Sequence, residues 1–410
     1  MKLFVVPVPI FDNNMAIDSY HLMFKSGDNL IIGDQSPTML DGIINPKLLE
    51  IIDDLGIETL TLGKPIFLPI SNITLLGDFH KHFKSQPSSI VLNIDASVTG
   101  TKVYLEKLEL CKSLGYKLAF KLPLHFEDNS SLLSLMDYIV VDQSTANKKE
   151  AIALLSKYSS CIAVASSVTT YNIFNLAKAT GYDLFEGRFY RVPITAGKIQ
   201  QVSPLKVLSV QLLNAVREDN FELDEISKIV EKDVALTVLL LKHINSQRFA
   251  TKIKTIQHAA AMLGQKELRK WVSTAASAQL ASDKPSEISK VSLIRAKFGE
   301  NLAPHFGMKL EADALFLMGL FSVIDVMLDL SIDEALTMVS VSDNIKDALV
   351  KHTGSYYPIY EFIQFYEAAD WTSVSRFLIL YGIAVEDIYE AYIDSVKWYK
   401  DLITSIIEGS

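Results

Sequence analysis

The chain has 410 residues, 49% of them hydrophobic, and a formal net charge of −9. This length predicts two domains, and so high an apolar fraction excludes a disordered chain, because disordered chains are poor in apolar residues. The negative charge argues against general affinity for nucleic acid.

The N-terminus and the cysteine content give expectations about the compartment. The start at Met1 lacks the long apolar region of a signal peptide. No apolar run approaches the ~18 residues that a membrane span requires. Cys111 and Cys161 are the only cysteines, too few for a disulfide framework. We therefore expect a protein of a reducing cytoplasm with no membrane contact.

Residues 1–200 alternate short apolar runs with amphipathic stretches. This alternation predicts a parallel α/β fold, and seven or eight repeats suggest a TIM-like (β/α) barrel. Since 200 residues are slightly few for a full barrel, we expect a trimmed or irregular one. The predicted strands are Leu3–Val8, Thr59–Leu62, Ile66–Ile70, Ile90–Ile94, Lys117–Phe120, Tyr138–Val141, Cys161–Ala165 and Asp183–Tyr190.

The segment Val192–Pro204 carries two prolines and one glycine and is the best candidate for a linker. Beyond it, apolar residues such as Leu205, Leu208 and Leu212 recur with helical spacing. We therefore predict a first domain at 1–200 and an all-helical second domain at 201–410. The second has a core at 203–281 and a helical remainder at 290–410.

The run Thr180–Pro193 resembles the closing strand of EAL domains, the barrels that hydrolyse cyclic di-GMP. Upstream segments resemble the same family in order, beginning with Tyr20–Lys25 at its name-giving motif. The resemblance implies carboxylates and an asparagine at the strand ends, which bind two divalent cations that activate water. At these positions the chain instead holds His21, Pro69, Asn93, Lys121, Leu122 and Ser166, while Val140 and Glu186 stand at a lysine and a glutamine of the family pattern.

This replacement argues against catalysis by the barrel. A pair of divalent cations requires several carboxylates, and the chain offers only Asp95, Asp142 and Glu186 nearby. We therefore expect no bound metal, no cofactor and no phosphodiesterase activity. Binding of cyclic di-GMP without hydrolysis stays open. Its candidate contacts are the cationic side chains at Lys25, Lys121 and Arg188, for which solvated strand ends are the alternative.

The segments Ile229–Ser246 and Ile253–Trp271 resemble the HDOD module, a relative of the HD phosphohydrolases. The resemblance implies a metal site built from histidines and an adjacent His-Asp pair. The chain contains no His-Asp dipeptide, and Ser322 stands where the histidine is expected. We interpret His243 and His258 as partly buried structural histidines. We therefore predict that the metal site of this second domain is also replaced.

The combined EAL–HDOD resemblance implies a bacterial signalling protein. With both sites replaced, we predict a non-enzymatic adaptor or regulator in second-messenger, motility or biofilm signalling, whose HDOD domain binds a protein partner. Two alternatives are a cyclic di-GMP effector that does not hydrolyse its ligand and a residual cyclic di-GMP phosphodiesterase.

A basic segment in the second domain is the candidate partner surface. Between Lys242 and Lys270 there are seven basic residues and one acid, Glu267. A nucleic-acid contact and a merely solvated helix surface are the alternatives. The candidate contact residues are Arg248, Lys252, Lys254, Lys266, Arg269 and Lys270.

Overall fold

The computed structural model describes residues 2–27, 30, 52, 53, 55–77, 79–81, 85–123, 130–145, 148–193, 204–217, 221–230 and 256–408. The chain divides into two compact units, Met1–Val192 and Pro193–Ser410. Each unit has its own hydrophobic core.

The first unit is a closed barrel of eight strands in sequence order, which confirms the predicted TIM-like architecture. Strand β1 runs antiparallel to both of its neighbours, and the remaining neighbouring pairs are parallel. The strands are β1 (Leu3–Phe11), β2 (Ile17–Ser26), β3 (Ile66–Ile70), β4 (Ile90–Ile94), β5 (Lys117–Lys121), β6 (Tyr138–Asp142), β7 (Ile162–Val168) and β8 (Leu184–Gly187).

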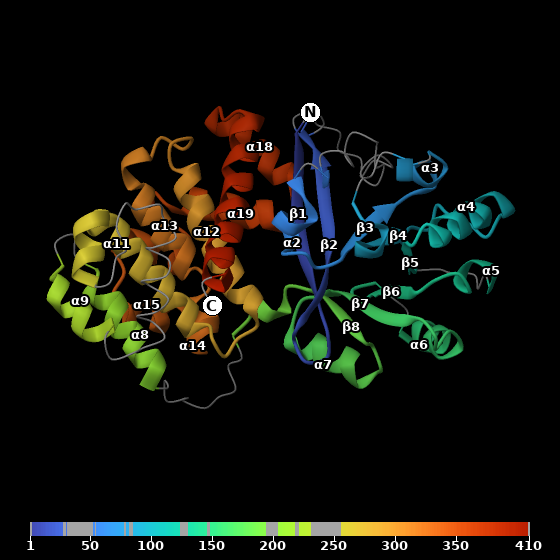
Figure 1. Ribbon diagram of the computed structural model, residues 1–410, viewed down its shortest axis with the longest axis horizontal. Helices are drawn as coiled ribbons and strands as arrows, with labels where there is room; N and C mark the ends of the chain where they lie inside the picture. Colours follow the sequence, from blue (N-terminus) through green and yellow to red (C-terminus); the bar gives the residue numbers. More distant parts are fainter. Residues whose placement is uncertain are drawn as a thin grey trace. The chain divides into compact units, whose positions relative to one another are not determined.

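Helices lie outside the ring of strands (Figure 1). They are α2 (Ile57–Thr61), α3 (Asn72–Leu76), α4 (Lys102–Ser113), α5 (Ser130–Leu133), α6 (Lys148–Lys157) and α7 (Tyr171–Ala179), with 3-10 turns at Phe79–Lys81, Pro87–Ser89 and Phe189–Arg191. Side chains of alternate strand residues fill the interior. This core contains Ile10, Phe67, Val91, Ala119, Tyr138, Val140, Val164 and Leu184.

Two details of the predicted strand order were wrong. Thr59–Leu62 was expected as a strand but lies largely in helix α2, because an apolar run this short fits either structure. Strand β2 was not predicted, since polar and apolar residues mix along it. It forms a hairpin with β1, and the Asp12 carboxylate secures the turn by accepting hydrogen bonds from the backbone N–H groups of Asn14 and Ala16.

The second unit contains helices and no strand among its described residues, as predicted. The helices are α8 (Pro204–Ala215), α9 (Leu223–Val230), α11 (Ile256–Leu280), α12 (Ser286–Leu302), α13 (Ala312–Phe321), α14 (Ile324–Leu328), α15 (Ile332–Met338), α16 (Asp343–Lys346), α17 (Tyr357–Ala368), α18 (Trp371–Tyr381) and α19 (Val385–Glu408), with a 3-10 turn at Lys309–Glu311 and a π-helical turn at Asp347–Lys351.

Helix α12 is central to this unit and crosses α13 very closely. A Cβ atom at Gly319 would lie 2.3 Å from the Arg295 carbonyl oxygen, so only glycine permits the crossing. On another side of α12, Phe298 packs edge-on against Tyr366 and Tyr392. Within the parts of the chain that the structure covers, no helix combines the length and apolarity needed to span a membrane.

Candidate functional site

The predicted EAL positions gather at the carboxyl ends of the barrel strands. Pro69, Asn93 and Lys121 each follow a core residue by two positions, as do Asp142 and Ser166 on β6 and β7. Because side chains on a strand alternate between its two faces, these residues share the interior side, one layer above the apolar core. We call this layer the barrel mouth.

His21 and Glu186 complete the barrel mouth from β2 and β8. The His21 Nδ1 atom lies 3.4 Å from Glu186 Oε2. The structure therefore brings together residues that are far apart in the sequence. Val140 does not join them, because it lies in the apolar core. Leu122 contributes a backbone hydrogen bond to the Val140 carbonyl at 2.9 Å.

A backbone irregularity between β7 and β8 shapes this end of the barrel. The register shifts between Ala165 and Val168, and Ser167 has a φ of 59°, in the left-handed region. Gly187 lies against the shifted segment, where a Cβ atom would be 2.0 Å from the Val168 carbonyl oxygen. The bulge therefore requires glycine at 187, directly after Glu186.

The two carboxylates of the barrel mouth are ionised near neutral pH. Burial acts to raise the pKa of Glu186, but the adjacent His21, followed by the charge of Lys121, brings it below its ordinary value. Burial likewise acts to raise the pKa of Asp142, and hydrogen bonds from Ser144 and Ser167, with the charge of Lys121, bring it below its ordinary value. Both carboxylates thus already interact with neighbours in the chain.

Buried polar atoms at the barrel mouth lack hydrogen-bond partners. Asn93 is 6% exposed and Ser166 is 4% exposed. Asn93 Oδ1 and Ser166 Oγ have no hydrogen-bond partner in the described part of the chain, and neither has His21 Nε2. Since a buried polar group without a partner is destabilising, such atoms indicate a place where water or a ligand binds.

The described residues contain no group of three or more histidine, cysteine, aspartate or glutamate side chains arranged to hold a metal. The candidate ligand contacts lie around the mouth. Lys25 is on the same face of β2 as His21, four residues further along, and is partly buried. Arg188 follows Gly187 and is also partly buried.

At the expected HD position of the second unit, Ser322 is part of a buried polar network. Its hydroxyl donates to the Gly319 carbonyl at 2.6 Å and accepts from Arg295 Nη1 at 3.0 Å. Arg295 forms a two-pronged ion pair with Glu367, at 2.9 and 2.8 Å. Nearby, burial raises the pKa of Asp325 to about 6. His258 is partly buried on α11, as interpreted from the sequence.

The predicted partner residues differ in accessibility. Arg248, Lys252 and Lys254 lie outside the described residues, as does His243. The side chain of Lys266 is 81% exposed and lies 3.7 Å from Asp313. Arg269 is partly buried.

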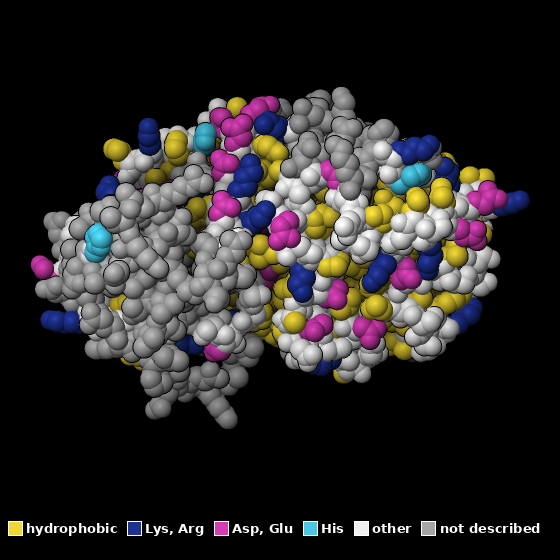
Figure 2. Space-filling model, in the orientation of Figure 1, with side chains coloured by type: hydrophobic (Ala, Val, Ile, Leu, Met, Phe, Trp, Pro, Cys, Tyr) yellow, Lys and Arg dark blue, Asp and Glu magenta, His cyan; other side chains and the backbone are white. Residues whose placement is uncertain are grey.

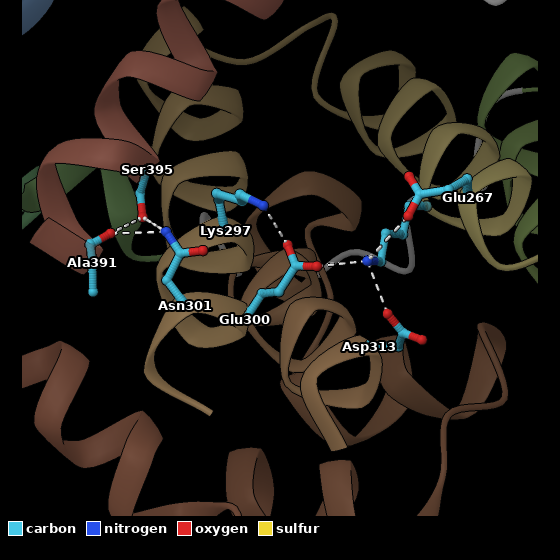
Figure 3. Close-up of polar contacts among 8 residues, drawn as sticks. Glu267, Lys297, Glu300, Asn301, Asp313, Ala391 and Ser395 are labelled. Atoms are coloured by element: carbon cyan, nitrogen blue, oxygen red, sulfur yellow. Dashed lines mark hydrogen bonds and ion pairs between the residues drawn. The ribbon is translucent and has the colours of Figure 1, made fainter. Parts of the chain in front are cut away.

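Lys270 is largely buried and its charge is balanced within the domain. Its Nζ lies 2.5 Å from Glu300 Oε1 and 2.8 Å from Asp313 Oδ1, and Glu300 also binds Lys297 at 2.9 Å (Figure 3). Burial would lower the pKa of Lys270, but the hydrogen bonds and charges of Asp313 and Glu300 raise it above its ordinary value. This lysine presents little charge to a partner.

Comparison with known proteins finds a family match within the second unit. Residues 203–342 match the HDOD domain. The chain contains an HDOD domain. Over 98% of its length it is similar to YuxH of Bacillus subtilis strain 168, with 28% identity over 420 residues that cover 99% of YuxH. The HDOD domain, the barrel and this similarity are consistent with an EAL–HDOD protein.

A second relative matches part of the chain. CdgJ of Vibrio cholerae serotype O1, named a cyclic di-GMP phosphodiesterase, is 32% identical over 241 residues, which cover 58% of this chain. The chain spans 56% of the length of CdgJ. Among solved structures, the cGMP-bound EAL enzyme Bd1971 matches with a TM-score of 0.39 and 13% identity, covering 45% of this chain and 60% of that chain. The PaMucR phosphodiesterase in complex with c-di-GMP gives a TM-score of 0.36 at 13% identity, covering 45% of this chain and 89% of that chain.

Proposed function

We propose that this protein is a non-hydrolysing component of cyclic di-GMP signalling that acts through protein contacts of its HDOD domain. The observation that carries the proposal is the composition of the barrel mouth. Lys121, Asn93 and Ser166 stand at strand ends where the EAL resemblance implies metal-binding carboxylates. Two divalent cations carry four positive charges, and a protonated lysine in place of a carboxylate ligand repels them. The relative CdgJ supports the link to cyclic di-GMP.

A turnover assay tests the lack of hydrolysis. We expect the full chain to leave cyclic di-GMP intact with Mg²⁺ or Mn²⁺ over hours, as followed by chromatography of the products. A matched variant, Asp142→Asn, removes a barrel-mouth carboxylate while keeping its size. Turnover by the natural chain that disappears in Asp142→Asn would show an active barrel site and overturn the proposal.

Binding of cyclic di-GMP without hydrolysis is the second candidate function. The unpartnered Asn93 Oδ1 and Ser166 Oγ atoms favour it, because a bound ligand would supply the missing hydrogen bonds. The ionised Glu186 and Asp142 oppose it, since phosphate groups carry the same charge. Isothermal titration of the full chain with cyclic di-GMP separates the two candidates, and Lys121→Gln tests whether any heat arises at the barrel mouth.

Protein contact through the HDOD domain is tested by site-specific photo-crosslinking in cells of the source organism. One variant carries the crosslinker in place of Lys266, whose side chain is 81% exposed. The control variant carries it in place of Lys102 of the barrel, whose side chain is 89% exposed. On the face drawn in Figure 2, basic and acidic side chains are interspersed over the barrel unit, so no single-sign surface there favours a charged partner. We expect a discrete adduct from position 266. Equal adducts from both positions would contradict a specific HDOD contact.

A further inference from the structure

A cavity of about 490 Å³ lies inside the second unit, between α8, α11, α13 and the connection from α15 to α16. This volume is within the range of pockets that bind small molecules. Its deep wall is apolar, with buried side chains from Val216, Phe321, Val339 and Ile345. The cavity extends beyond residue 342, where the HDOD match ends, because Asn344, Ile345 and Tyr356 also line it.

Among the described residues, the lining holds one more cation than carboxylate. Three cations, Arg217, Lys266 and Arg269, face two carboxylates, Glu311 and Asp313. Asp313 is also bound at 2.8 Å by Lys270, which lies outside the lining. Burial acts to raise the pKa of Asp313, but the hydrogen bond and charge of Lys270, followed by the charges of Lys266 and Arg269, bring it below its ordinary value. The Tyr356 hydroxyl donates to Glu311 at 2.6 Å.

The lining also offers polar and apolar side chains to different parts of a bound ligand. The side chains of Ser273, Ser342 and Asn344 add hydrogen-bonding groups to the lining. Leu310, also part of the lining, is 97% exposed, so its whole side chain is accessible to the apolar part of a bound molecule.

We infer that this cavity binds a small molecule in which one anionic group, a phosphate, sulfonate or carboxylate, is joined to an apolar body. The apolar wall buries the body, and the cations hold the anion. The inference goes beyond the proposed function, which assigns no small-molecule site to the second unit.

A matched pair of dyes tests both parts of the inference on the full chain. The anionic dye 8-anilinonaphthalene-1-sulfonate and the neutral N-phenyl-1-naphthylamine share the aromatic body and differ in the sulfonate. We expect the anionic dye to bind one site with at least about tenfold higher affinity, because only it pairs with the cations. Competition with inorganic phosphate and with GMP distinguishes a bare anion from an anion joined to a larger body, and we expect GMP to compete more strongly.

Three variants locate the site. Lys266→Glu should weaken the anionic dye about tenfold and leave the neutral dye unchanged. Ala314→Trp fills the cavity from α13 and should abolish binding of both dyes. Lys309→Glu, an equal charge change on an exposed lysine outside the lining, should alter neither. Circular dichroism checks folding, and Lys266→Glu keeps the test decisive if Ala314→Trp misfolds. Equal affinity of the two dyes, or an equal loss in Lys266→Glu and Lys309→Glu, would overturn the inference.

Discussion

Buried polar groups at the barrel mouth contrast with two bonded networks in the second unit. At the mouth, Asn93 Oδ1 and Ser166 Oγ lack partners among the described residues. In the second unit, Arg295 is bound by Glu367 and Ser322, and Lys270 by Glu300 and Asp313. A fully bonded network stabilises the fold by itself, whereas polar atoms without partners weaken it. Among the described residues, the second unit also holds buried atoms without partners, such as Ser277 Oγ and Asn214 Oδ1, so the contrast is between the mouth and these two networks.

The chain provides a separate spectroscopic reporter for each unit. Its three tryptophans, Trp271, Trp371 and Trp398, all lie in the second unit. Its two cysteines, Cys111 and Cys161, are both buried in the barrel. Tryptophan fluorescence therefore follows unfolding of the second unit, and thiol reactivity follows opening of the barrel, in one sample of the full chain.

Glu367→Ala gives the largest expected effect, because it leaves the Arg295 guanidinium buried without its carboxylate. We expect the free energy of unfolding of the second unit to fall by about 3 kcal/mol or more, as for other broken buried ion pairs. Urea titration followed by tryptophan fluorescence measures the change. Lys351→Ala, which removes a surface ion pair with Asp347, is the control and should leave the midpoint unchanged. Equal small changes would show that the bonded network is dispensable.

Gly187→Ala tests whether the barrel mouth has its own rigid geometry. The added Cβ would meet the Val168 carbonyl at 2.0 Å, so the strands must separate. We expect a loss of about 3 kcal/mol, the upper range for overpacking, together with faster reaction of the barrel thiols. At Gly77 a Cβ would lie 3.4 Å from the nearest atom, and Gly77→Ala is the control. Unchanged thiol rates in Gly187→Ala would mean that the bulge adapts freely.

The sequence predicted much of this arrangement, because barrel strands and helices carry strong periodic patterns. The strand ends that bear Asn93, Lys121 and Ser166 were assigned correctly, since each follows a short apolar run. Strand β2 was not predicted because polar and apolar residues mix along it without a clear hydrophobic periodicity. The polar network around Arg295 and the cavity lined by Arg217 could not be predicted, since their residues meet only through helix packing and share no local pattern.

The free energy of unfolding of the second unit should depend on pH, with an effect of intermediate size. Burial raises the pKa of Asp325 from 3.8 to about 6, so between these values the folded unit holds a proton that the unfolded chain has lost. Stability therefore falls as pH rises from about 4 to about 6 and then stays at the lower level. Asp325→Asn removes this penalty.

We expect the Asp325→Asn variant to equal the natural chain near pH 4 and to exceed it by about 1–2 kcal/mol at pH 7.5, a figure reduced for partial solvent exposure. Tryptophan-monitored urea titrations at several pH values measure the difference. A difference that is constant across this range would show that Asp325 does not titrate in the folded unit between these pH values.

The smallest expected effect comes from replacing one buried serine by alanine in each of the two regions. Ser292 is buried in the second unit and its hydroxyl donates to the Leu320 carbonyl at 2.6 Å, so Ser292→Ala should cost about 1 kcal/mol. Ser166→Ala at the barrel mouth removes a hydroxyl without a partner among the described residues. We expect it to stabilise the barrel by about 0.5–1 kcal/mol, measured by slower thiol reaction. Opposite signs would support a mouth kept polar for an external ligand, whereas a loss in both variants would show that Ser166 is bonded within the fold.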